Sequence, residues 1–161
     1  MIVYHGSIDI VKVPDTKHSY TTLDFGTGFY VTSNKEQARR WAYRKALYAN
    51  KDRGYINSYD MKENYTSFNV KTFPDDLQEW IDFVCRCRSK GDDYRKYDII
   101  IGMVANDRVF RVVDLYLQGV WDKLRALQEI KAYPDYNQIA FISQKAIDNL
   151  LSFNSYEEVK L

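Results

Sequence analysis

The sequence predicts a single α+β domain, and three observations support this class. Segments with strand and helix periodicity follow one another irregularly, which argues against a doubly wound parallel sheet. The chain has 161 residues, of which 45% are hydrophobic, enough to bury one sizeable core. No repeat, low-complexity tract or Pro/Gly-rich linker divides it. We therefore expect one domain over residues 1–153 and a frayed C-terminal tail over residues 154–161.

The N-terminal third is predicted to contain two short strands and one helix. Residues 2–4 form the first predicted strand, and residues 28–32 form the second after a turn-rich segment. Asn34 followed by Gln37 matches a helix start of the capping-box kind. The apolar spacing that follows predicts a helix as far as about Ala49.

The middle of the chain is predicted to add two strands, an amphipathic helix and a buried strand. Residues 55–59 and 67–70 have strand composition, and Pro74 opens a helix. Five apolar residues with helical spacing define the buried face of that helix: Leu77, Trp80, Ile81, Val84 and Cys85. Residues 98–104 contain three consecutive isoleucines, which predicts a central strand that is buried on both faces.

The last third is predicted to contain two helices, a strand and a final helix. Asn106 and Asp107 are placed to cap a helix that ends at Gly119. A shorter helix follows, with apolar side chains at Leu124, Leu127 and Ile130. Residues 138–143 then have the composition of a strand, and residues 144–151 have that of a helix.

Charge and cysteine content exclude several classes of protein. The 23 Lys and Arg and 22 Asp and Glu residues give a formal net charge of +1, so no global field favours nucleic acid or membranes. The first strand begins at Ile2 and no apolar run is long enough to span a bilayer, so we expect a cytoplasmic protein. Cys85 and Cys87 alone give no disulfide framework. The histidines, His5 and His18, are far from them in sequence, so we expect no metal site.

Three segments place ligand-binding residue types at strand ends, namely residues 4–7, 24–30 and 137–138. Each has a structural alternative, because a His-Gly pair often only forms a turn and glycine also serves where φ is positive. No G-x-G-x-x-G or G-x-x-x-x-G-K-[ST] motif occurs, which excludes the Rossmann and P-loop phosphate sites. A nucleophile elbow and a defensible pair of acid–base carboxylates are also missing from the sequence.

Together, these segments resemble the site of the His-Tyr-Glu class of ADP-ribosyltransferases, which includes the poly-ADP-ribose polymerases and diphtheria toxin. The resemblance lies in YHGS at 4–7, GFYVT at 28–32 and NQIAF at 137–141. The chain is also similar to an uncharacterised bacterial family with five ordered motifs: YHGS, D-F-G-x-G-F-Y-x-T, E-Q-A-x-x-W-A, Y-D-I-x-I-G-x-V-A-N-D and N-Q-I-x-F. The resemblance implies an ADP-ribosyltransferase-like fold, with two small packed β-sheets in a split core flanked by helices.

The resemblance also implies a role for each matching residue. His5 is expected to hydrogen-bond a ribose hydroxyl of NAD, and Gly6 to present its backbone to the nicotinamide amide. Tyr30 is expected to lay its ring against the nicotinamide. Ser7 is a candidate NAD contact, although a hydroxyl at a strand end also bonds local backbone.

The third position departs from the class, because Gln138 stands where the transferases carry glutamate. A neutral amide orients hydroxyl groups but brings no charge to an oxocarbenium-like transition state, which disfavours chain-elongating polymerase activity. Asp24 or Asp107 would supply a carboxylate if the fold brings either near Gln138. Asp107 and Asn106 are candidates for the NAD site and, equally, for a helix cap.

The implied activity is NAD-dependent mono-ADP-ribosyl transfer to a protein or nucleic-acid acceptor, through cleavage of the nicotinamide–ribose bond. The bacterial family implies a toxin with a small antitoxin protein as partner. Two alternatives stay open: a non-catalytic NAD- or nucleotide-binding module, and a protein-interaction domain that keeps the fold. A basic run on the first helix is interpreted as a solvated face, with NAD pyrophosphate or nucleic acid as the alternative. It consists of Arg39, Arg40, Arg44 and Lys45.

Overall fold

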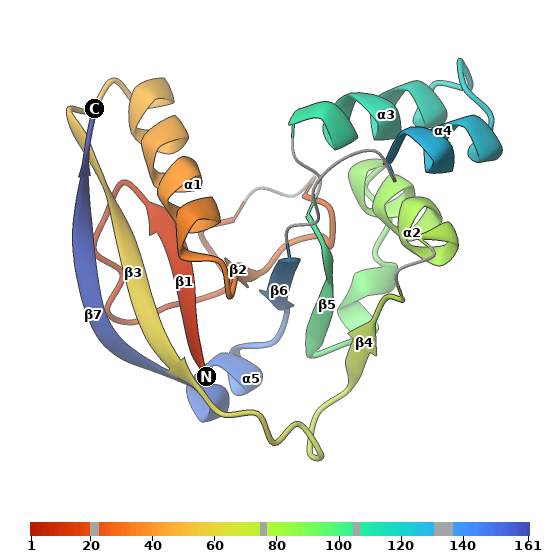
Figure 1. The fold of residues 1–161 in the computed structure, drawn as a ribbon. Helices are drawn as coiled ribbons and strands as arrows, with labels where there is room; N and C mark the ends of the chain where they lie inside the picture. Colours follow the sequence, from red (N-terminus) through yellow and green to blue (C-terminus); the bar gives the residue numbers. More distant parts are fainter. Residues whose placement is uncertain (20–22, 75–76, 105–106, 131–136) are drawn as a thin grey trace.

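Two small β-sheets, each with helices on its outer side, make up the architecture (Figure 1). The computed structural model of the protein describes residues 1–19, 23–74, 77–104, 107–130 and 137–161, with the backbone alone at 107–108. The predicted α+β class and the pair of small sheets are confirmed.

The first sheet, sheet A, is antiparallel throughout and has the strand order β1-β3-β7. Its strands are β1 (Ile2–Ser7), β3 (Arg53–Met61) and β7 (Leu151–Lys160). Helix α1 (Lys35–Tyr48) packs on β1 and β3. The contact consists of small and branched apolar side chains: Ala38, Ala42, Ile56 and Val159.

The second sheet, sheet B, has the order β2-β6-β5-β4 and joins β4 to β5 in parallel. Its strands are β2 (Phe29–Val31), β4 (Val70–Thr72), β5 (Ile99–Met103) and β6 (Asn137–Phe141). Its outer side carries α2 (Gln78–Arg88), the 3-10 helix η1 (Asp93–Lys96), α3 (Asp107–Leu117) and α4 (Lys123–Ile130). These helices gather on the side of the molecule away from sheet A (Figure 1).

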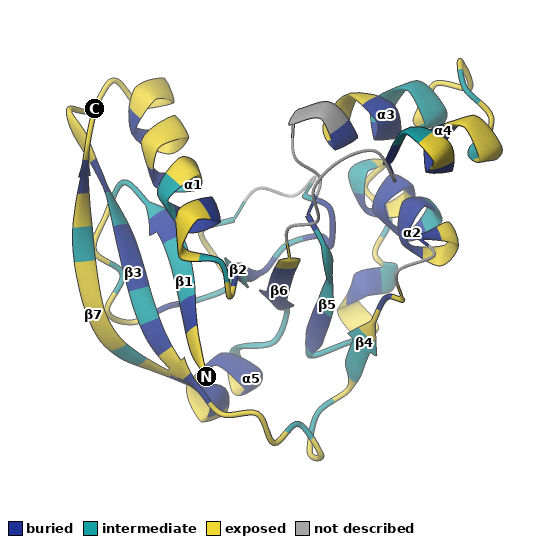
Figure 2. Ribbon diagram, in the orientation of Figure 1, coloured by how far each residue is buried: buried dark blue, intermediate teal, exposed yellow. Residues whose placement is uncertain are grey.

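A shared core joins the two sheets and seats helix α5 (Gln144–Leu150). Sheet A contributes Val3 and Tyr59, and sheet B contributes Phe29 and Phe141. Figure 2 shows buried residues along the length of β3; Ile56 packs with α1, and Tyr59 and Met61 belong to the shared core, so both faces of the strand are covered. The sheets therefore fold as parts of one unit.

The apolar periodicity located most elements correctly. All five residues expected on the inner face of α2 are buried, and β5 lies between β6 and β4 with Ile99 and Ile100 buried on opposite faces. Asn34 caps α1 by accepting from the Gln37 N–H at 3.1 Å. The Gln37 side chain does not close a capping box, because it donates to the Asn137 carbonyl oxygen instead.

The start of α2 differs from its predicted position, and the two cysteines are unpaired. α2 begins at Gln78 rather than at Pro74, and Asn106, expected as a cap of α3, lies outside the described residues. Cys85 and Cys87 are free thiols, and burial raises their pKa values to about 11 and about 12. In the described part of the chain, no helix combines the length and apolar character needed to cross a membrane.

The expectation of a frayed C-terminal tail is wrong. Residues 154–160 belong to β7, which pairs with β3 from Arg53↔Lys160 to Met61↔Leu151. Only Leu151 and Val159 of β7 are buried, and mostly polar residues lie between them, so the segment lacks an apolar run. Its order comes from pairing with a strand about 100 residues earlier in the chain.

Substituting Val159 tests whether β7 contributes to the folded state. Val159 is buried against α1, so Val159→Ala should lower the free energy of unfolding by about 2 kcal/mol. Ser152→Ala, at an exposed position of the same strand, is the control and should change it by less than about 0.5 kcal/mol. Urea unfolding measures both, and equal midpoints for the two variants would contradict the assignment.

Candidate functional site

The candidate site lies where β1 and β2 diverge. One backbone bridge joins these strands: the Tyr4 N–H donates to the Thr32 oxygen at 2.8 Å, and the Thr32 N–H donates to the Tyr4 oxygen at 2.9 Å. At the next position the strands are joined by a side chain in place of backbone pairing: His5 Nδ1 hydrogen-bonds to the Tyr30 carbonyl oxygen at 2.6 Å. The two sheets are therefore split from His5 onward.

Gly6 is buried and lies on the edge of β1 that faces this split. Because both backbone groups of Tyr4 point toward β2, the alternation of an antiparallel strand turns those of Gly6 the same way, away from β3. Lys45 Nζ donates to the Gly6 carbonyl oxygen at 2.7 Å. A Cβ at Gly6 would lie 2.2 Å from the Ala38 oxygen, so this glycine is required by the approach of α1. Neither a turn nor a positive φ explains it.

His5 is held as a neutral imidazole of one tautomer. Burial, and next the positive charge of Lys45, lower its pKa from 6.5 to about 3, against the opposite effect of the hydrogen bond to Tyr30. A carbonyl oxygen only accepts, so Nδ1 carries the proton and Nε2 is a hydrogen-bond acceptor. No group of the described residues bonds Nε2, and the ring stacks on Phe29 at 4.4 Å between centroids.

Tyr30 faces the opposite side of β2 from Phe29. Its hydroxyl donates to the Gly26 oxygen at 2.6 Å and accepts from the Phe25 N–H at 3.0 Å. Burial, with the negative charge of Asp24 as the second cause, raises the pKa of Tyr30 well above its usual value. The hydroxyl therefore anchors the 24–28 turn, and only the half-buried ring offers a surface to a ligand.

Gln138 lies on the same face of sheet B as Tyr30, two residues along β6 from Ala140, the partner of Tyr30 in the β2–β6 register. It is 3% exposed. Its Nε2 donates to the Met103 carbonyl oxygen at 2.8 Å and to Asp24 Oδ2 at 3.3 Å. Both partners are acceptors, so the amide orientation is fixed and both Nε2 hydrogens are used. The carbonyl oxygen, Oε1, is the group that Gln138 has left for a ligand.

Asp24 belongs to a buried ionic group around Arg88. Arg88 donates to Asp24 Oδ1 from Nε at 3.0 Å and from Nη2 at 2.7 Å, and from Nη1 to Asp114 Oδ1 at 3.3 Å. The guanidinium also lies 3.9 Å from the centre of the Phe110 ring. We call Arg88, Asp24 and Asp114 the Arg88 cluster. With two carboxylates and one guanidinium, its three members carry a net negative charge.

The structure brings some predicted site residues together and separates others. His5, Gly6 and Tyr30 meet at the split, and Asp24 lies beside Gln138, as required for it to supply a nearby carboxylate. Ser7 accepts a hydrogen bond from the Asp9 N–H at 3.2 Å, which is the local backbone contact given above as its alternative. Asp107 begins α3, with its side chain outside the described residues.

Two site residues were missed by sequence reasoning. Lys45 was assigned to a solvated face, and the residue is exposed, but its ammonium reaches the Gly6 carbonyl oxygen, where burial lowers the pKa of the ammonium to about 8. Arg88 was not among the residues that the sequence predicted for the site. Its signal in the sequence is weak, because its partners lie 64 and 26 residues away. Within the described ranges, no group of three or more His, Cys, Asp or Glu residues is arranged to hold a metal.

The lowered pKa of His5 predicts acid sensitivity of the fold. Below about pH 6.5 the unfolded chain gains a proton at His5 that the folded chain does not take up until about pH 3. The free energy of unfolding therefore decreases as the pH is lowered from about 6.5 to about 3. Between about pH 7.5 and about pH 5 it should remove roughly 1–2 kcal/mol. His5→Phe should abolish this part of the loss, and His18→Phe on an exposed loop should keep it. Urea unfolding at both pH values measures the free energy of unfolding. An equal loss of this free energy in the wild type and in His5→Phe would contradict the neutral state of His5.

Comparison with known proteins identifies the family. No curated protein and no solved structure matches the chain. The family described as "Protein of unknown function (DUF3990)" matches residues 1–153, which include every described residue of the site. The chain therefore belongs to the DUF3990 family.

Proposed function

We propose that the protein binds NAD at the β1–β2 split and acts as a mono-ADP-ribosyltransferase. The observation that carries the proposal is the backbone edge of Gly6 beside the neutral His5. A carboxamide such as that of nicotinamide needs an acceptor for its NH2 and a donor for its oxygen. The Gly6 N–H is a donor on this edge, and the Gly6 carbonyl oxygen, which already accepts from Lys45 Nζ, has a second lone pair for the NH2. His5 Nε2 offers an acceptor to a ribose hydroxyl.

The architecture supports an ADP-ribosyltransferase-like fold as part of this proposal. Two small sheets, joined by a single bridge and flanked by helices, match the split core that the sequence resemblance implies. Strands β1, β2 and β6 carry His5, Tyr30 and Gln138, the three positions of the His-Tyr-Glu pattern. Strand β2 adjoins both of the others through the Tyr4–Thr32 bridge and the β6 ladder.

The proposed reaction breaks the bond between nicotinamide and its ribose. The electron pair leaves with the nicotinamide nitrogen, positive charge develops on the ribose carbon, and an acceptor nucleophile bonds to that carbon and loses a proton. Gln138 Oε1 orients a ribose hydroxyl, and the Asp24 carboxylate beside Gln138 favours the cationic transition state. In this scheme Asp24 acts through the electrostatic field and through the orientation of Gln138.

A second candidate is NAD binding without efficient turnover. It is favoured by the ion pair between Asp24 and Arg88, because the guanidinium offsets the negative charge of the carboxylate nearest to Gln138. A protein-interaction domain that keeps the fold but binds no NAD is the third. The role of a bacterial toxin with a small antitoxin partner, and a cytoplasmic location, rest on the sequence resemblance and the absence of an apolar span.

Incubating the full chain with NAD separates these candidates. Calorimetry measures binding, chromatography measures nicotinamide release, and labelled NAD with cell lysate reveals transfer to protein or nucleic acid. Release and transfer together support the transferase, binding without release supports the second candidate, and no binding overturns the NAD proposal.

His5→Phe is the matched variant for this test. It keeps a ring to stack on Phe29 but removes both the Nδ1 donor to the Tyr30 carbonyl oxygen and the Nε2 acceptor. The loss of the Nε2 bond alone should lower NAD affinity about tenfold, the equivalent of roughly 1.4 kcal/mol for one hydrogen bond. His18→Phe makes the same change on an exposed loop and should bind NAD as the wild type does. Equal affinities for both variants would remove His5 from the site.

Gln138→Glu should impair the protein, although glutamate is the residue of the transferase class. The carboxylate would face two acceptors, the Met103 carbonyl oxygen and Asp24, in a nearly closed environment. The free energy of unfolding should fall by roughly 2–4 kcal/mol at neutral pH and by less at low pH, where the new carboxyl is protonated. Gln128→Glu on the exposed side of α4 is the control for the added charge. An undiminished stability together with faster nicotinamide release would show that the amide is not required here.

A further inference from the structure

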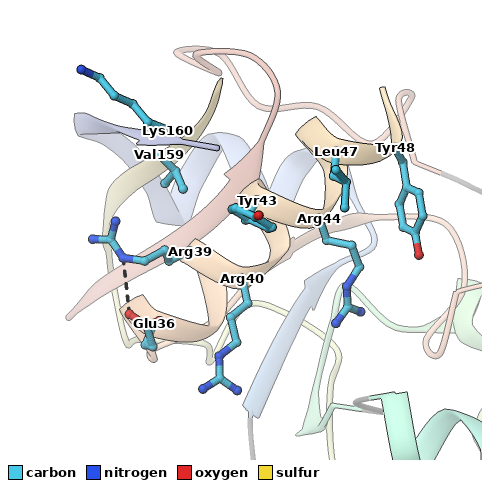
Figure 3. Close-up of a pocket in the computed structure, with 9 residues that line it drawn as sticks. All are labelled: Glu36, Arg39, Arg40, Tyr43, Arg44, Leu47, Tyr48, Val159 and Lys160. Carbon is cyan, nitrogen blue, oxygen red and sulfur yellow. Dashed lines mark ion pairs between the residues drawn. The ribbon is translucent and has the colours of Figure 1, made fainter. Parts of the chain in front are cut away.

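The basic run of helix α1 divides into two groups that face different parts of the molecule. Its three arginines line a hollow along the helix and the end of β7, and Lys45 is not among the residues that line this hollow (Figure 3). Lys45 comes seven residues after Ala38 and three after Ala42, so it shares the side of α1 that packs on sheet A. Its ammonium therefore belongs to the β1–β2 split and not to the hollow.

The positive charge of Lys45 lacks a counter-ion within the described ranges of the chain. Its Nζ donates to the Gly6 carbonyl oxygen at 2.7 Å, and no described Asp or Glu pairs with it. Burial alone lowers the pKa of the ammonium to about 8, so the group is still mostly protonated at neutral pH. The neighbouring His5 is neutral. Because a cation taken out of water is costly unless it is paired, an anionic ligand group would be stabilised at this point.

The Gly6 N–H is a second donor beside this cation. It lies on the edge of β1 that faces the split, because strand alternation turns it away from β3. The N–H and the carbonyl group of one strand residue project from the same edge. A planar group that accepts from the Gly6 N–H therefore has its other end near the Gly6 carbonyl oxygen, to which Lys45 Nζ is bonded. An ammonium has three hydrogens to donate, and Gly6 uses one of them.

This pair of donors suits a carboxylate better than a carboxamide. A carboxylate only accepts, so one of its oxygens can bond the Gly6 N–H while the other bonds Lys45 Nζ. A carboxamide has one oxygen, and its NH2 must share the Gly6 carbonyl oxygen with the ammonium, whose positive charge repels the amide hydrogens. Lys45 thus favours the acid form of a ligand over its amide form.

We propose that Lys45 selects a dinucleotide whose pyridine ring carries a carboxylate, the nicotinic acid counterpart of NAD, in preference to NAD itself. The inference rests on the proposed function, because it keeps the pyridine substituent at Gly6 and the ribose at His5. The pyrophosphate lies beyond that ribose, so the ring substituent is the group that reaches Lys45. The bonds broken and formed are those already given, and nicotinate leaves with the electron pair in place of nicotinamide.

Calorimetry on the full chain with NAD and with nicotinic acid adenine dinucleotide tests this directly, since the two ligands differ only in that substituent. The wild type should bind the acid form about tenfold more tightly, the equivalent of one charge-assisted hydrogen bond. Lys45→Met keeps an unbranched side chain and removes the charge. It should weaken binding of the acid form at least about tenfold and change NAD affinity less than about threefold. Lys45→Arg restores the charge and should keep the acid form ahead.

The control removes a lysine charge elsewhere. Lys62→Met changes an exposed residue just beyond the end of β3 and should alter both affinities less than about twofold, because solvent and salt screen its charge.

Two results overturn the inference and leave the NAD proposal standing: equal or tighter binding of NAD by the wild type, and an acid-form preference that survives in Lys45→Met. Binding of neither dinucleotide overturns both proposals. Binding of the acid form alone supports the inference and shows that the NAD proposal names the wrong dinucleotide.

Discussion

The close approach of α1 to sheet A is the constraint on which the rest of the site depends. A Cβ at Gly6 would meet the Ala38 oxygen at 2.2 Å, and one at Gly54 would meet the Ala42 oxygen at 2.6 Å, so the helix backbone lies directly on two strands. This seating brings Lys45 within reach of the Gly6 carbonyl oxygen. It also brings Gln37 to β6, where its side chain ties the start of the helix to sheet B.

The charges around the split are arranged with opposite signs at its two ends. Lys45 lies at the Gly6 edge, and the Asp24 carboxylate, which pairs with Arg88, lies beside Gln138. In the proposed reaction, positive charge leaves the nicotinamide ring and develops on the ribose carbon. A cation near the carboxamide edge and a carboxylate near the ribose favour that displacement, even though Gln138 itself is neutral.

The sequence predicted those features that depend on neighbouring residues and missed those that depend on distant ones. The inner face of α2, the double burial of Ile99 and Ile100 and the Asn34 cap follow from local spacing. The order of β7 follows from pairing with β3, and the position of Lys45 follows from contact with β1, which no local pattern encodes. The candidate site shows the same division, because its strand-end residues were predicted and Arg88 was not.

The strand order of sheet A has a consequence for how the protein folds. The central strand, β3, is flanked by β1 near one end of the chain and by β7 near the other, so completing this sheet closes loops of about 50 and about 100 residues. Such high contact order slows folding, because loop-closure entropy is lost before the contacts form. Because His5 lies on β1, its surroundings at the split depend on these long-range pairings.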